Sequence, residues 1–228
     1  MSPPPAVIFD LDGTLVDSLD DIALALGRAL ADAGLPPPPR PRVRAWVGDG
    51  ARSLVARALA GRADVDAVLA RFRDHYRAHP VVHTRVYDGV AAVLDAVVAA
   101  GRRLAILSNK PDDLTRTVAD ALLAAWPFAV VRGHRPDHPL KPDPAAALAV
   151  AAELGVAPAR CTFVGDSEVD VATGRAAGMR TAAVSWGLRD RAVLAAAGPD
   201  HLVDAPAELL AALLGADHDA APRRAAPR

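Results

Sequence analysis

The chain has 228 residues and a formal net charge of −1, with 26 basic and 27 acidic side chains. That length suits one domain, or one domain with a smaller insertion, and the near-neutral charge gives no sign of a nucleic-acid or membrane-surface partner. Cys161 is the only cysteine, so an internal disulfide is excluded and we expect a buried thiol.

Five short apolar runs each end in a small or polar cluster, as strands buried on both faces of a parallel sheet do. Stretches with helical periodicity lie between them, at 88–101, 143–155 and 169–178. Strands that alternate with helices predict a doubly wound α/β fold. The predicted strands are AVIF before Asp10, RLAIL before Ser108, FAVV before Arg132, CTFVG before Asp166 and TAAVS before Trp186.

Residues 18–85 interrupt this alternation. A helix with acidic residues in its first turn is followed by PPPPRP (36–41), which predicts a stiff, non-helical connector. Two more helical stretches follow near 51–60 and 64–79. We therefore expect an all-helical insertion at 18–85 with a hinge near each end, a core formed by 1–17 and 86–215, and a disordered tail at 216–228.

Functional groups follow three of the predicted strands, and a loop adds one more. Taken singly, each has an ordinary interpretation as a helix cap, a turn or a surface charge. Together they fall where an open α/β sheet binds ligands, beyond the carboxyl ends of its strands. The groups are Asp10 with Asp12, Ser108 with Asn109, Asp166, and Lys141 in the loop HPLKPDP.

These residue types suit the hydrolysis of a phosphate ester. Carboxylates of Asp10 and Asp166 and the main-chain carbonyl of Asp12 are suitable oxygen ligands for Mg²⁺. Lys141 and Ser108 can hold the phosphoryl oxygens while Asp10 attacks phosphorus and forms an aspartyl-phosphate. Asp12, two residues along and on the same side, can protonate the leaving alcohol and later activate water.

The motifs DLDGT (10–14), SN (108–109), Lys141 and GDSEVD (165–170), in this order, resemble the four motifs of the haloacid-dehalogenase superfamily of phosphohydrolases. The resemblance implies a Rossmann-like three-layer core and a helical cap that closes over small substrates. It also implies that Asp10 is the nucleophile, Asp12 the acid and base, and that Asp10, Asp12 and Asp166 hold Mg²⁺. Ser108, Asn109 and Lys141 would bind the phosphoryl group, with Thr14 and Asp170 supporting the site.

Within this superfamily the sequence favours a phosphatase. Dehalogenases lack the second aspartate, phosphonatases need a lysine in the cap, and sugar-phosphate mutases use a histidine in the first cap helix. This chain has Asp12, no lysine within 18–85 and no histidine within 18–34. The segments VGDGARSLVARAL (47–59), SNKP and FVGDSEVDVATGRAAGM resemble phosphoglycolate phosphatases in particular, although the loop VVRGHRPDHPLKP departs from their pattern.

The first-choice substrate is therefore 2-phosphoglycolate. Arg52 is a candidate cation for the glycolate carboxylate, or else an exposed helix charge. Nucleoside monophosphates, sugar phosphates and pyrophosphate remain alternatives, as does a non-catalytic regulator that binds a phosphorylated ligand. We interpret Lys110 as a residue that lines the entrance. With no secretory signal and no long apolar run, we expect a cytoplasmic monomer or homodimer with no membrane partner.

Overall fold

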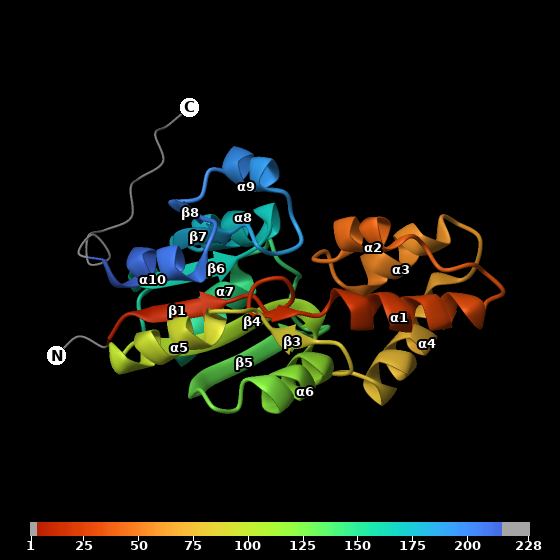
Figure 1. Ribbon diagram of the computed structural model, residues 1–228, viewed down its shortest axis with the longest axis horizontal. Coiled ribbons are helices and arrows are strands. Elements are labelled where there is room, and N and C mark those ends of the chain that lie inside the picture. The colour runs from red at the N-terminus through yellow and green to blue at the C-terminus, as the bar shows by residue number, and fades with distance from the viewer. Residues whose placement is uncertain (1–3, 216–228) are drawn as a thin grey trace.

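The computed structural model describes residues 4–215 (Figure 1). Within this range six parallel strands form one sheet in the order β5-β4-β1-β6-β7-β8. The predicted α/β fold with a parallel sheet is confirmed, but the sixth strand was not predicted. The strands are β1 (Ala6–Phe9), β4 (Arg103–Pro111), β5 (Phe128–His134), β6 (Cys161–Gly165), β7 (Arg180–Val184) and β8 (His201–Val203).

Helices cover both faces of the sheet and make three layers. Alternate residues of β1 face opposite sides, as the strand period requires: Val7 and Phe9 pack with α5, α6 and α10, whereas Ile8 packs with α7. On the second face α8 and α9 also pack against β7. The helices are α5 (Val90–Ala99), α6 (Asp112–Leu122), α7 (Ala145–Glu153), α8 (Glu168–Ala176), α9 (Arg191–Ala197) and α10 (Pro206–Leu214).

Four helices lie together at one end of the molecule, beyond β4 (Figure 1). They share an apolar core of their own, which includes Leu26, Leu59 and Phe72. We refer to this bundle as the cap. Its helices are α1 (Leu19–Ala31), α2 (Arg40–Trp46), α3 (Ala51–Leu59) and α4 (Val65–Ala78). The prediction of a non-helical connector through Pro41 was wrong at its end, because proline is well tolerated in the first turn of a helix.

The two chain segments that connect the cap with the sheet pair with each other. β2 (Val16–Asp17) and β3 (Arg85–Val86) form a two-stranded antiparallel ribbon, which the sequence did not predict. Beside it, the buried Asp21 of α1 accepts hydrogen bonds from the backbone N–H groups of residues 82–84. Both segments are therefore fixed at the same point. No helix within residues 4–215 has both the length and the apolar character of a membrane span.

Candidate active site

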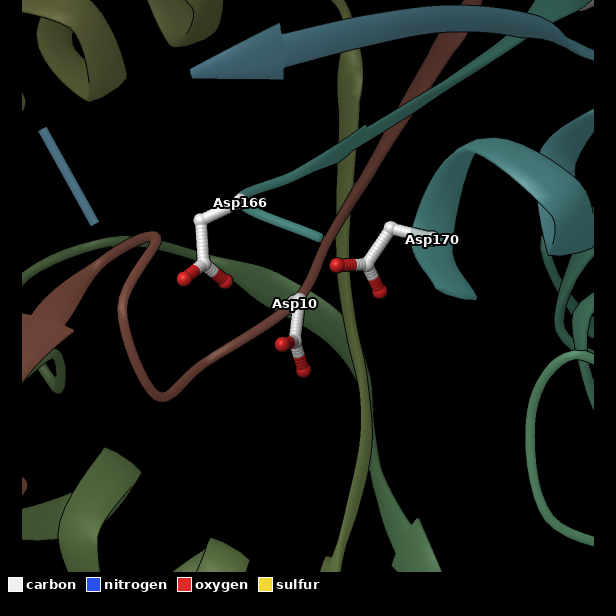
Figure 2. Close-up of side chains that lie close together, drawn as sticks. All are labelled: Asp10, Asp166 and Asp170. Atoms are coloured by element: carbon white, nitrogen blue, oxygen red, sulfur yellow. The ribbon is translucent and has the colours of Figure 1, made fainter. Parts of the chain in front are cut away.

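Three buried carboxylates meet at the carboxyl edge of the sheet. β1 lies between β4 and β6, and its last residue, Phe9, is in register with Val164 of β6. Asp10 and Asp166 therefore leave neighbouring strands at about the same level. With Asp170 of α8, they offer oxygen atoms that all lie within 4.8 Å of one another. Figure 2 shows these three side chains turned toward a shared space.

Lys141 lies among these carboxylates. Its Nζ atom is 2.9 Å from Oδ1 of Asp10 and 2.6 Å from Oδ1 of Asp170, and it also donates to the Leu107 carbonyl. The other oxygen of Asp170 accepts hydrogen bonds from the hydroxyl and backbone N–H of Ser167, which begins α8 with a capping box. A helix cap thus fixes the carboxylate that holds the lysine.

The site has more negative than positive charge. Asp10, Asp12, Asp166 and Asp170 are buried with only two ammonium groups, Lys110 and Lys141. Burial raises the pKa of Asp10, and the charges of Asp170 and Asp12 act in the same direction although Lys141 opposes them. Burial also raises the pKa of Asp166, as do Asp170 and Asp10. If all four carboxyl groups are ionised, they carry two negative charges more than the two ammonium groups offset, which equals the charge of one divalent cation.

These residues fit a divalent cation on chemical grounds. Hard cations such as Mg²⁺ prefer carboxylate and carbonyl oxygens, and the site supplies three carboxylates in reach of one another. Oδ1 of Asp10 lies near the Lys141 ammonium but, within the described residues, accepts no well-directed hydrogen bond. A buried carboxylate oxygen of that kind is available as a ligand.

Gly13 and Thr14 fit closely around Asp166. Gly13 has φ +86°, and a Cβ atom there would lie 2.2 Å from Oδ2 of Asp166. The Thr14 hydroxyl donates to Oδ1 at 3.3 Å, while the backbone N–H of Leu188 donates to Oδ2 at 2.7 Å. The glycine of the DLDGT motif is therefore needed for close approach as well as for its backbone conformation.

Asp12 points toward the cap rather than toward the carboxylate cluster. Its side chain accepts a hydrogen bond from the Ser18 hydroxyl, and both of its oxygens lie within 3.1 Å of Nζ of Lys110. The same ammonium donates to the hydroxyl of Tyr76 in α4 at 2.7 Å. Lys110 is buried and lines the cavity beside Asp12; its interpretation as a residue that lines the entrance did not include this pairing with Asp12. Sequence reasoning also missed Ser18 and Tyr76.

Ser108 and Asn109 lie within β4, which continues beyond the predicted end at Leu107. Ser108 lines the cavity beside Asp10. The amide of Asn109 instead holds backbone: it accepts from the N–H of Lys141 and donates to the carbonyls of Lys141 and Gly48. Asn109 thus fixes the loop that carries Lys141 and contacts the cap loop.

The structure does not bring Arg52 to this cavity. Arg52 lies on the outer side of α3, with its side chain 61 % exposed, and pairs with Asp66 of α4. Apolar side chains of the cap, including Leu54 and Phe72, line the cavity opposite Asp10. The sequence offered two interpretations of Arg52, and its position here is that of an exposed helix charge.

The model of the haloacid dehalogenase-like hydrolases matches residues 4–178. The chain belongs to this family. A phosphoglycolate phosphatase from Rhodospirillum rubrum is 43% identical over 81% of this chain and 80% of its own length. An N-acetylmuramic acid 6-phosphate phosphatase from Pseudomonas aeruginosa is 38% identical over 90% of this chain and 92% of its own.

Solved structures agree with this assignment. A haloacid dehalogenase-like family hydrolase from Streptococcus pneumoniae superposes with a TM-score of 0.84 at 26% identity, over 92% of this chain and 98% of the other. The resemblance inferred from the four motifs is confirmed, and the protein is an enzyme of the phosphatase type.

Proposed function

We propose that the protein is a Mg²⁺-dependent phosphomonoesterase that hydrolyses 2-phosphoglycolate through an aspartyl-phosphate on Asp10. The convergence of Asp10, Asp166 and Asp170 with Lys141 at the sheet edge is the observation that carries this proposal. Mg²⁺, when bound by Asp10, Asp166 and the Asp12 carbonyl, would offset charge on the phosphoryl oxygens.

The residues of the chain then divide the chemistry between them. Lys141 and Ser108 hold the phosphoryl group in line with a carboxylate oxygen of Asp10. As the new Asp10–phosphorus bond forms, the ester P–O bond breaks and Asp12 gives its proton to the departing oxygen. Water then attacks phosphorus and gives a proton to Asp12. The Asp10–phosphorus bond breaks in this step, so phosphate is released and the Asp10 carboxylate is restored.

The cavity and the relatives support a small substrate. Side chains of α1, α3 and α4 line the cavity together with Asp10 and Ser108, so the cap bounds the space that a substrate would occupy. The relative from Rhodospirillum rubrum acts on phosphoglycolate according to its name, and the one from Pseudomonas aeruginosa on N-acetylmuramic acid 6-phosphate. The second compound, a larger sugar phosphate, is therefore the alternative substrate that we would test first.

The test measures kcat/KM with Mg²⁺ on a panel of phosphate esters that contains both compounds, a nucleoside monophosphate and pyrophosphate. We expect the highest value for 2-phosphoglycolate, and a panel without preference would refute that substrate. The variant Asp10→Asn should form no phosphoenzyme and release no phosphate. Turnover by that variant, shown by mass spectrometry to be free of deamidation, would refute the mechanism.

A further inference from the structure

Lys110 is a buried cation at the contact between cap and core. The chain has only two lysines, Lys110 and Lys141, and both lie in the site. Nζ of Lys110 contacts Oδ1 of Asp12 at 3.0 Å, Oδ2 at 3.1 Å and the hydroxyl of Tyr76 at 2.7 Å. An ammonium group has three N–H donors, so these three acceptors satisfy it fully.

Tyr76 reaches Lys110 from the cap. It lies in the last part of α4, is 1% exposed, and packs beside Phe72. Its ring also lies against the ammonium, with Nζ 4.3 Å from the ring centroid. A buried ammonium is costly unless it is paired and hydrogen-bonded. Tyr76 therefore helps to hold Lys110 in this position, and Lys110 in turn holds Asp12.

Other contacts keep the cap against the core without Lys110. Asn109 donates to the Gly48 carbonyl, Arg44 of α2 donates to the Gly187 carbonyl, and Arg189 donates to the Val47 carbonyl. Loss of the Tyr76 hydroxyl alone leaves all three in place. The contact between Tyr76 and Lys110 can thus be removed while the cap remains docked.

From this geometry we propose that Lys110 and Tyr76 are positioning residues, which hold the Asp12 carboxyl group against the leaving-group oxygen when the cap lies on the sheet edge. The proposal rests on the function proposed above, in which Asp12 protonates that oxygen. It makes acid catalysis depend on cap docking: with the cap away from the core, Tyr76 is absent and Lys110 is exposed to water.

The test exploits the leaving group. An alkyl phosphate releases an alkoxide and needs the proton from Asp12, whereas p-nitrophenyl phosphate releases a stable anion and does not. In single-turnover experiments, Lys110→Met should slow cleavage of 2-phosphoglycolate and of 2-hydroxyethyl phosphate about 100-fold. The burst of p-nitrophenolate should change less than about threefold. Tyr76→Phe should slow cleavage of the two alkyl phosphates about tenfold and again leave the p-nitrophenolate burst nearly unchanged.

Three comparisons make the result decisive. Asp12→Ala should reproduce the pattern of Lys110→Met, and Lys110→Arg should restore part of the rate with alkyl phosphates. Val68→Ala, which loosens the apolar core of α4 without touching Lys110, should leave the ratio between the two substrate types unchanged. If Lys110→Met fails to fold, Tyr76→Phe, which lacks a single oxygen atom, still decides the question.

Two outcomes would overturn the proposal. Equal losses with alkyl and p-nitrophenyl phosphates would show that Lys110 supports the fold or phosphate binding rather than Asp12. A loss confined to 2-phosphoglycolate, mainly in KM, would show that Lys110 binds the substrate carboxylate instead. Neither outcome bears on the nucleophile, which Asp10→Asn tests separately.

Discussion

The ammonium of Lys141 lies 2.6 Å from Oδ1 of Asp170, and both side chains are buried. Asp170 is fixed by the Ser167 cap, so this pair determines where the ammonium sits beside Asp10. We expect Asp170→Asn to lower kcat/KM about 10–100-fold, as the loss of a supporting carboxylate does in metal-dependent sites. Steady-state kinetics over a Mg²⁺ titration measure this loss.

A matched control is Glu168→Gln, because Glu168 lies in the same first turn of α8 but is 45% exposed and pairs with Arg189. This variant should stay within about twofold of the wild type. Full activity of Asp170→Asn would show that Lys141 is positioned well enough by Asp10 and the Leu107 carbonyl.

Gly13 is a glycine for two reasons, which are its positive φ and its close approach to Asp166. In Gly13→Ala the new Cβ atom would lie 2.2 Å from Oδ2 of Asp166, at a backbone φ of +86°. We expect a loss of about 1–3 kcal/mol in the free energy of unfolding from backbone strain, together with weaker Mg²⁺ binding because Asp166 must move. Urea unfolding and Mg²⁺ titration by calorimetry measure the two effects.

Gly34 provides the control for strain alone. It has φ +71°, and no atom lies within 4 Å of the position a Cβ atom would take. Gly34→Ala should therefore lose stability without a change in Mg²⁺ affinity. If both variants bind Mg²⁺ as the wild type does, the close approach of Gly13 to Asp166 has no role in metal binding.

The convergence of Asp10 and Asp166 could be predicted from the sequence because one rule places it: parallel strands end at a common edge. No comparable rule predicts β8 and the start of α2, which were missed. β8 has only three residues, His201–Val203, too few for a clear apolar run. α2 begins within a proline-rich segment whose composition is typical of extended chain.

The contacts of Lys110 with Asp12 and Tyr76 were missed for a different reason. A strand that ended at Leu107 would leave Lys110 in a loop, but β4 continues to Pro111 with an irregular register against β5. In this irregular part of β4 the Lys110 side chain is buried against Asp12. Tyr76 lies within the helical stretch predicted near 64–79, and nothing in its spacing indicates that its hydroxyl contacts Lys110, 34 residues later.

The buried Asp21, beside the β2–β3 ribbon, makes the stability of the fold depend on pH. Burial alone would raise the pKa of Asp21, but the Thr84 hydroxyl and the backbone N–H groups of residues 82–84 outweigh it and hold this pKa below its ordinary value. A lowered pKa stabilises the folded state above the unfolded pKa of 3.8, and the benefit is lost as the pH falls through the folded pKa.

We therefore expect Asp21→Asn to lower the free energy of unfolding at pH 7 by about 1–3 kcal/mol. The difference from the wild type should persist down to about pH 5 and close below about pH 4. Urea unfolding across this range measures it. Asp20→Asn, at a half-exposed position paired with Arg40, should show no difference in the free energy of unfolding that disappears at low pH. A difference between Asp21→Asn and the wild type that is independent of pH would contradict the role given to the Asp21 carboxylate.

Cys161 should be inert in the folded protein. The thiol is 1% exposed in β6, and burial raises its pKa to about 11. Because the thiolate is the reactive form, iodoacetamide at pH 8 should leave the native protein unlabelled and label it fully in urea, as intact mass spectrometry would show. Mg²⁺ should not change the native result, since Cys161 begins β6 at the end opposite Asp166. Rapid labelling of a fully folded sample would mean that this end of the sheet opens readily.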